Sequence, residues 1–371
     1  MSRDADPHGR LDLCEATLSS LRAVEKALRY FHPLLIPDLN TRLAPFIQRL
    51  SETRKNFKIG RDSSLTREQS SVLNEAASLA QEALELFFEQ DDLQQIVFNS
   101  LKAARKYSQA QELLFPLRWV IQPVHLSFLE EDSHAYFSSP EHSSFFEHGD
   151  ECFHVGLEDD HYARGTCSYY IPPGFPGDQG FPLVAVLHGG AGHGRDFLWF
   201  WLRESRSRGC VLMAPTSRFD TWSILRVKEE LESIGEHIER VSTKVNIDRE
   251  WMLLTGISDG ATFSLACSLE AETPFAAFAP ICGVLPPGDM EPAYGRRILW
   301  IHGMHDWMFP HQRAQEGAAM LRNAGADITL NILTDLAHAY PREQNASILE
   351  WFSPALVLPR SEGVRSGEYT A

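Results

Sequence analysis

The sequence predicts an α/β fold with an α-helical region in front of it, and two observations support this prediction. Residues 9 to about 116 place apolar side chains at steps of three and four, which is the spacing of one helical face. From about residue 163 onward, short apolar runs alternate with segments of helical period. That alternation is typical of a mostly parallel sheet that helices cover on both faces.

Composition and charge indicate a globular chain. Of the 371 residues, 43% are hydrophobic and 23% are charged, which excludes a largely disordered chain and a small disulfide scaffold. The net charge is −16, and residues 1–116 carry 15 basic and 16 acidic side chains, so the acidic excess lies in residues 117–371. This excess argues against a nucleic acid as partner, because binding to its phosphates needs a positive face.

No motif predicts a metal site or a membrane span. The six cysteines include no Cys-x-x-Cys pair, so we expect neither a zinc site nor a redox motif. The first ten residues are polar and do not resemble a signal peptide, and no run approaches the roughly 18 apolar residues of a membrane span. We therefore expect a cytoplasmic protein with reduced thiols.

Four helices are predicted in the first part of the chain, in a small bundle. Thr66 followed by Gln69 matches a capping box, which predicts the start of the third helix. Pro45 predicts a kink or a restart in the second helix. The predicted organisation is a helical region, a linker that leads into the next domain, an α/β catalytic domain and a C-terminal tail, over residues 1–116, 117–162, 163–356 and 357–371.

Short apolar runs predict the strands of the α/β domain. They are Leu183–Leu187, Val211–Ala214, Trp251–Leu254, Ala276–Phe278, Ile298–Ile301 and Ile328–Leu333. Ligands of parallel sheets bind at the carboxyl ends of the strands. The residues that follow these runs are therefore the candidates for function.

The sequence GISDG, with Ser258 at its centre, follows the third run and precedes a helical segment. A sharp strand-to-helix turn lifts the central side chain above the sheet edge, and crowding two residues to either side favours glycine. The partial positive charge at the start of the helix favours a developing anion. Ser258 is therefore predicted to be a nucleophile. The alternative is a glycine-rich turn with a capping serine.

The sequence HGGAG follows the first run. A glycine-rich turn at a strand end lets backbone N–H groups point at a substrate oxygen. We expect an oxyanion hole formed by Gly189 and Gly190, with the N–H of Asp259 as the second donor. A phosphate-binding loop is the alternative, but neither G-K-[ST] nor G-x-G-x-x-G is present.

Two further strand ends supply a candidate acid and a candidate base. Asp306 lies in HGMHDWMFP after the fifth run, and His338 lies in LAHAYP after the sixth. A buried carboxylate orients a histidine and stabilises its imidazolium. The alternatives are a turn-capping aspartate and a structural histidine. His302 and His305 suggest a metal site, but no third ligand with convincing spacing accompanies them.

With these motifs in place, residues 163 to about 354 resemble the α/β-hydrolase superfamily. The LHGG turn, the GISDG elbow, the HGMHD acid turn and the terminal AHAYP histidine are similar to those of the phospholipase/carboxylesterase group, which includes acyl-protein thioesterases. The resemblance implies an α/β-hydrolase fold and hydrolysis of a small-molecule ester or thioester through Ser258, His338 and Asp306. It also implies that no metal and no organic cofactor takes part.

Two features depart from that group. Asp259 stands where relatives often carry Gln, His, Met or Ala, and its carboxylate would repel anionic substrates if it faced the cleft. The helical region is absent from minimal members. We expect it to dock on the catalytic part and shape access to Ser258, or to form a homodimer contact. A structural appendage remote from the cleft is the alternative.

Aromatic residues beside the motifs predict an apolar cleft. Trp199 follows the oxyanion loop, and Trp307 and Phe309 flank the acid, so all three are candidate substrate contacts. Core packing is the alternative for each of them. Two other functions remain open for the whole chain: a peptidase with the same three residues, and a non-catalytic interaction protein on the same scaffold.

Overall fold

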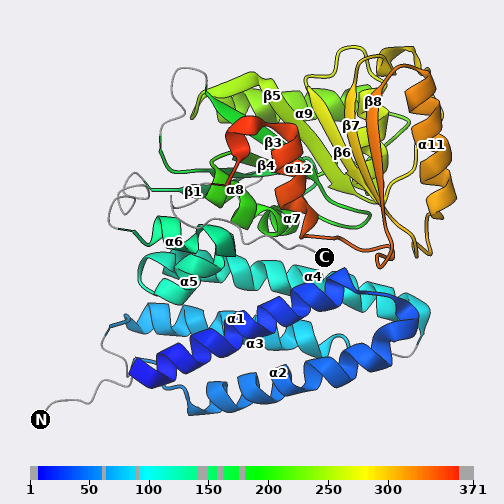
Figure 1. Cartoon of the computed structure of the whole chain (residues 1–371). Coiled ribbons are helices and arrows are strands. Elements are labelled where there is room, and N and C mark those ends of the chain that lie inside the picture. Colours follow the sequence, from blue (N-terminus) through cyan, green and yellow to red (C-terminus); the bar gives the residue numbers. More distant parts are fainter. Residues whose placement is uncertain are drawn as a thin grey trace, which may run out of the picture.

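The structure is a computed structural model, and it divides into a helical region and an α/β part that lie one against the other (Figure 1). The residues it describes are 7–60, 64–88, 92–139, 149–156, 160, 162–174 and 180–358. Predictions that concern residues 140–148 or the tail beyond residue 358 lie outside the described residues.

The helical region contains the four predicted long helices. They are α1 (Pro7–Arg29), α2 (Ile36–Asn56), α3 (Arg67–Glu85) and α4 (Leu93–Leu114). Thr66 caps α3 with both halves of the capping box, as predicted. The predicted restart at Pro45 is wrong, because α2 continues through it. Leu43 and Leu50 are buried on either side of this proline, and their packing offsets the one backbone hydrogen bond that proline cannot donate.

Eight strands form one sheet in the order β1-β2-β4-β3-β5-β6-β7-β8. The strands are β1 (Glu151–Val155), β2 (Cys167–Ile171), β3 (Phe181–Leu187), β4 (Val211–Pro215), β5 (Ile247–Ile257), β6 (Ala277–Ile281), β7 (Arg297–Gly303) and β8 (Asp327–Leu333). β1 and β2 are antiparallel to their neighbours, and the other six strands are parallel. The predicted α/β-hydrolase fold, with a helical region in front of it, is therefore confirmed.

Helices cover both faces of the sheet, because successive residues of each buried strand point to opposite faces. Leu183 and Ala185 of β3 join one core with the helices α9, α10 and α11, while Val184 and Val186 join the other core with α12. The helices of this part are α7 (Gly194–Phe197), α8 (Leu202–Arg208), α9 (Val227–Ser242), α10 (Asp259–Ser268), α11 (His311–Asn323) and α12 (Gln344–Phe352). Short 3-10 turns connect the elements at η1 (Pro33–Leu35), η2 (Phe115–Trp119), η3 (Glu131–Ser133), η5 (Leu198–Phe200), η6 (Glu291–Ala293) and η7 (Pro354–Leu356).

Residues 117–162, which the sequence predicts as a linker, contain more regular structure than expected. The helices α5 (Gln122–Ser127) and α6 (His134–Phe137) precede β1, and β1 adds an edge strand to the sheet through its pairing with β2. Two of the five residues of β1 are exposed and three are half-buried. Phe153 and Val155 share one face and pack against the core. Two apolar residues in alternation are too short a pattern to predict a strand from the sequence.

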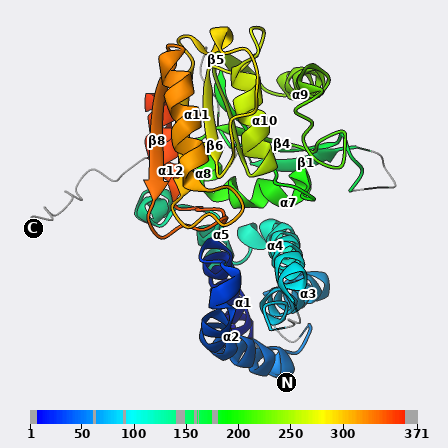
Figure 2. The ribbon, with the colours of Figure 1, turned by 90° about the vertical axis from the view of Figure 1, so that its right-hand side faces the viewer.

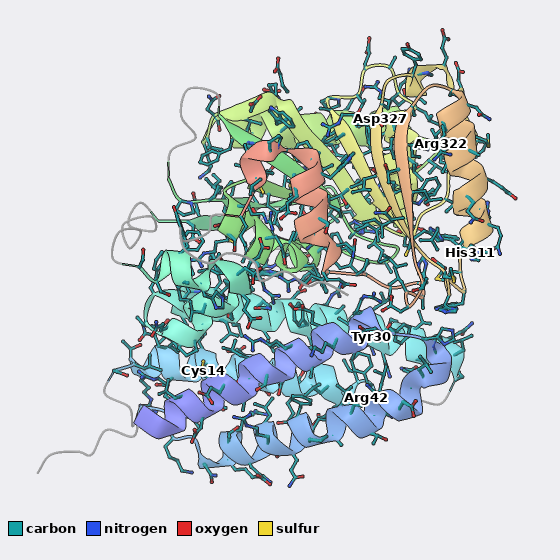
Figure 3. All side chains as sticks on the ribbon, in the orientation of Figure 1. Cys14, Tyr30, Arg42, His311, Arg322 and Asp327 are labelled. Carbon is teal, nitrogen blue, oxygen red and sulfur yellow. The ribbon has the colours of Figure 1, made fainter. Side chains whose placement is uncertain are left out.

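The carboxyl ends of the parallel strands face the helical region (Figure 2). In Figure 3, Asp327, where β8 begins, and Arg322 lie far from the helical region, whereas His311, where α11 begins, lies near it. One apolar core continues from α1–α4 to the sheet face that carries α12. The rings of Tyr107 on α4 and Phe200 beside α7 meet across this boundary, with centroids 5.2 Å apart. The loops that follow these strands, which contain the candidate site residues, therefore lie on the side of the sheet that faces the helical region.

Candidate active site

Ser258 occupies a strained turn between β5 and α10. Its backbone has φ 56° and ψ −116°, a conformation that costs a non-glycine residue about 1–3 kcal/mol. A Cβ atom on Gly260 would lie 2.6 Å from the carbonyl oxygen of His188, and one on Gly256 would lie 2.7 Å from the Cβ of Leu187. Glycine is therefore required on both sides of the serine, which explains the spacing of the GISDG motif.

His338 connects Ser258 with Asp306. Its Nε2 lies 2.9 Å from the Oγ of Ser258, and its Nδ1 lies 2.8 Å from the Oδ2 of Asp306. Because a carboxylate can only accept, Nδ1 carries the proton and donates to Asp306, while Nε2 is left to accept from the serine hydroxyl. The structure thus brings together three residues from the ends of three strands.

Asp306 is held by its own turn as well as by His338. Its Oδ1 accepts hydrogen bonds from the backbone N–H groups of Met308, at 2.9 Å, and Phe309, at 2.7 Å. The Asp306 side chain is fully buried. A buried carboxyl group needs hydrogen-bond partners, and these two bonds satisfy one of its oxygens and orient the side chain toward His338.

His302 supports the acid turn, a role that the sequence did not reveal. Its Nε2 donates to the carbonyl oxygen of Phe309 at 2.8 Å and lies 3.5 Å from the Oδ2 of Asp306. Burial lowers the pKa of His302, so the ring stays neutral.

Over the part of the chain that the structure describes, no three His, Cys, Asp or Glu side chains gather as a metal site would require.

The loop after β3 lies directly over Ser258. A Cβ atom on Gly189 would lie 3.5 Å from the Cβ of Ser258. Among the described residues, none accepts a hydrogen bond from the backbone N–H of Gly190 or of Asp259, which are two of the three groups, with Gly189, expected to point at a substrate oxygen. Asp259 is also the first residue of α10, where the helix dipole favours negative charge.

His188 fixes the shape of this loop. Its Nδ1 donates to the carbonyl oxygen of Gly189 at 2.7 Å, and its Nε2 accepts from the backbone N–H of Ser217 at 3.2 Å. The indole N–H of Trp222 donates to the His188 carbonyl oxygen at 2.9 Å. Burial lowers the pKa of His188 to about 3, so the ring stays neutral and keeps this tautomer. His188, the first residue of the HGG motif, therefore stabilises the loop, a role that the sequence analysis did not predict.

The carboxylate of Asp259 lies between Thr221 and Gly190 of the loop after β3. Its Oδ2 accepts a hydrogen bond from the Oγ1 of Thr221 at 2.7 Å. A Cβ atom on Gly190 would meet the same oxygen at 2.8 Å. The carboxylate therefore fills the space that glycine leaves in the loop, and Thr221 binds it there.

Of the three candidate aromatic contacts, two lie beside His338 and the third lies in the core. The rings of Trp307 and Phe309 lie beside His338, with centroids 6.2 and 5.3 Å from the imidazole. Trp199 is not a contact of this site: it is 2% exposed and packs against Phe115, with ring centroids 5.6 Å apart. The turn η5 directs Trp199 into the core beneath the sheet, so core packing is the correct interpretation for this residue.

The fold is that of the α/β hydrolases, and comparison with known proteins gives distant similarities. No family model matches the chain. A bifunctional acetylxylan esterase/xylanase of Neocallimastix patriciarum is 24% identical over 155 residues, which are 41% of this chain and 22% of that protein. The chain therefore spans about a fifth of the length of this relative.

Several solved structures are similar to parts of the chain at low identity. A thermostable esterase is 20% identical with a TM-score of 0.45, over 56% of this chain and 63% of its own. SOBER1 of Arabidopsis thaliana is 16% identical with a TM-score of 0.39, over 47% and 99%. An acylaminoacyl peptidase of Pyrococcus horikoshii is 15% identical with a TM-score of 0.42, over 58% and 43%. No helix within the described ranges is long and apolar enough to cross a membrane.

Proposed function

We propose that this chain is a serine hydrolase that cleaves carboxylic esters or thioesters. Ser258 is the nucleophile, His338 is the general base, and Asp306 is the carboxylate that orients His338. The observation that supports this most directly is the position of His338. It stands between the Ser258 hydroxyl at 2.9 Å and the Asp306 carboxylate at 2.8 Å, within the reach that proton transfer needs.

In the proposed reaction, Nε2 of His338 takes the proton from Ser258 as its Oγ attacks the carbonyl carbon. Asp306 stabilises the imidazolium that forms. When the tetrahedral intermediate collapses, the bond to the alcohol or thiol breaks, and the leaving group takes the proton from Nε2. Water then attacks the acyl-enzyme in the same way and releases the acid and the free serine.

The negative charge of the tetrahedral intermediate falls on the former carbonyl oxygen. We assign its stabilisation to the backbone N–H groups of Gly189 or Gly190 and of Asp259. The neutral ring of His188 holds the Gly189–Gly190 peptide in place, because its Nδ1 donates to the Gly189 carbonyl oxygen. The start of α10 adds the partial positive charge of a helix terminus.

The surroundings of the acid favour an uncharged, partly apolar substrate. Met304, Trp307 and Met308 expose apolar side chains on the turn that carries Asp306. The net charge of −16 also disfavours an anionic substrate. A small neutral ester such as p-nitrophenyl butyrate is therefore the first substrate to test.

The decisive variant is Ser258→Ala, which removes only the hydroxyl. We expect hydrolysis of p-nitrophenyl butyrate to fall by about 10⁴–10⁶-fold, and labelling by a fluorophosphonate probe to disappear. Ser264→Ala is a matched control, because this serine lies on α10, the helix that follows Ser258, is buried, and donates to the carbonyl oxygen of Leu254 away from the site. If Ser258→Ala hydrolyses the ester as fast as Ser264→Ala, the assignment of the nucleophile is wrong.

A further inference from the structure

We propose that α1 of the helical region holds His338 in its catalytic position, with Glu25 and Arg29 as positioning residues. The segment that they bind is the connector between β8 and α12, residues 334–343, which carries His338 near its middle. This inference rests on the proposed function of His338. It assigns to the helical region a part in catalysis other than shaping substrate access.

The first contact lies on the α12 side of His338. Arg342, four residues after the histidine, donates from Nη1 to the Oε2 of Glu25 at 2.7 Å and to the hydroxyl of Tyr107 at 2.7 Å. The Arg342 side chain is 5% exposed. A buried guanidinium needs a compensating charge. Glu25 supplies it from α1, and Glu204 of α8 adds a second carboxylate at 3.6 Å.

Glu25 is charged at every pH at which the protein would work. Burial alone would raise its pKa, but the charges of Arg342 and Arg203 and the hydrogen bond from Tyr107 lower it to about 2. Its Oε2 accepts from Arg203 of α8 at 3.2 Å as well as from Tyr107 at 3.0 Å. One carboxylate therefore joins α1, α4, α8 and the histidine connector.

The second contact reaches both ends of the connector. Arg29, one turn after Glu25 on α1, donates from Nε to the Oε1 of Glu343 at 2.5 Å and from Nη2 to the Oδ1 of Asp335 at 3.0 Å. Asp335 lies three residues before His338 and Glu343 lies five residues after it. The Arg29 side chain is 9% exposed, so these ion pairs are partly shielded from solvent.

The α/β part holds the connector on both sides of the histidine. Ahead of it, the backbone N–H of His305 donates to the carbonyl oxygen of Leu336 at 2.9 Å. After it, the Tyr340 ring packs on Phe197 and Phe200. The guanidinium of Arg342 binds Glu25 of α1 at 2.7 Å and lies 3.6 Å from Glu204 of α8, so the shorter of its two ion pairs is the one to α1. A shift of about 1 Å at a catalytic group costs up to about 100-fold in rate. Loss of the α1 contacts should therefore reach the reaction through the imidazole.

A purely structural docking contact is the competing explanation, and Glu130 provides a control for it. Its carboxylate binds Arg208 through two hydrogen bonds, at 2.6 and 2.9 Å. Arg208 lies on α8, as Arg203 does, and the Glu130 side chain is 13% exposed against 21% for Glu25. Glu130→Gln thus breaks a comparable ion pair between the chain before the sheet and α8 without touching residues 334–343.

The experiment compares Glu25→Gln, Arg29→Gln and Glu130→Gln in the full chain. We measure kcat and KM for p-nitrophenyl butyrate, the rate of fluorophosphonate labelling, and the downfield proton resonance of the His338–Asp306 hydrogen bond. For Glu25→Gln and Arg29→Gln, we expect kcat and the labelling rate to fall about 10–100-fold with little change in KM. The downfield resonance should shift or broaden in these two variants and stay unchanged in Glu130→Gln.

Two results would overturn the inference. One is folded Glu25→Gln and Arg29→Gln proteins that keep the wild-type kcat and resonance. The other is an equal loss of kcat in Glu130→Gln. If Glu25→Gln does not fold, Arg29→Gln and Asp335→Asn still decide, since Asp335 is 57% exposed and replacing it leaves no buried charge on the connector side.

Failure of the proposed function would look different from failure of this inference. In that case the wild-type chain neither hydrolyses the ester nor reacts with the fluorophosphonate. The proton resonance is independent of turnover, so it still reports whether Glu25 and Arg29 fix the bond between His338 and Asp306.

Discussion

Asp306 uses each of its two oxygens for a different task, and this makes Asp306→Asn a sharp test. Oδ1 accepts from two backbone N–H groups, so the amide of asparagine must place its oxygen there and its NH₂ toward His338. The imidazole then has to accept at Nδ1 and carry its proton on Nε2, facing Ser258. We expect kcat to fall about 10⁴-fold with KM nearly unchanged.

The measurement for Asp306→Asn is steady-state ester hydrolysis together with a melting curve. The melting temperature should stay close to that of the wild type, because the amide keeps the shape of the carboxylate and the two bonds of the turn. A variant that keeps kcat within tenfold of the wild type would show that His338 does not depend on Asp306.

At the scale of residues, the sequence allowed prediction of those that follow a strand within a short motif. Ser258, Asp306 and His338 each meet that condition, and the structure brings Ser258 and Asp306 within hydrogen-bond distance of His338. Glu25 and Arg29 do not meet it. A charged residue on a predicted helix usually faces solvent, and the sequence does not say which helix positions face a segment about 300 residues away.

At the scale of elements, two glycines in helices predict opposite effects of replacement by alanine. Gly260→Ala would place a Cβ atom 2.6 Å from a backbone oxygen that cannot move alone, and overpacking of this kind costs about 1–3 kcal/mol. Gly235 lies within α9, and a Cβ atom added to it would have no neighbour within 4 Å, so Gly235→Ala should stabilise the protein by about 0.5–1 kcal/mol.

Urea unfolding measures both glycine variants on one scale. Gly260→Ala should also lose ester hydrolysis, because the displaced backbone carries Ser258 and the N–H of Asp259. A Gly260→Ala protein as stable and as active as the wild type would mean that the turn is looser than the distances indicate.

The elements that could be predicted share one property, which is a strong period in the sequence. The parallel strands are short apolar runs, and the helices α1 to α4 repeat apolar residues at steps of three and four. β1 is an edge strand of five residues, and only Phe153 and Val155 alternate as apolar residues on one face, which is too short a pattern to predict a strand. Trp199 is predicted as a substrate contact because it follows a motif, but it is buried. The sequence near a motif does not indicate whether an aromatic side chain points toward the site or into the core.

At the scale of the whole molecule, buried histidines predict sensitivity to acid. Burial lowers the pKa of His188 to about 3 and those of His125 and His193 to about 4. Their unfolded pKa is about 6.5, so the unfolded chain binds more protons between these values. The stabilisation is complete above about pH 6.5 and is lost as the pH falls toward the folded-state values.

We expect the free energy of unfolding to fall between pH 7 and pH 5, with about 1–2 kcal/mol from the fully buried His188 alone. Urea titrations at the two pH values measure this loss. His193→Asn should reduce the slope, because asparagine does not titrate. An unfolding free energy equal at both pH values would contradict the neutral state of these histidines.

The ion pairs between α1 and the connector, residues 334–343, also affect the order in which the chain folds. Glu25 and Arg342 are 317 residues apart, and Arg29 and Asp335 are 306 residues apart. During synthesis, α1 can pack on α2, α3 and α4 soon after it emerges, but the connector partners of Glu25 and Arg29 are made only near the end. Contacts of such long range form late and slow the final step of folding. The contacts proposed to position His338 therefore form only after the sheet is nearly finished, so the proposed catalytic base is the last group to be fixed.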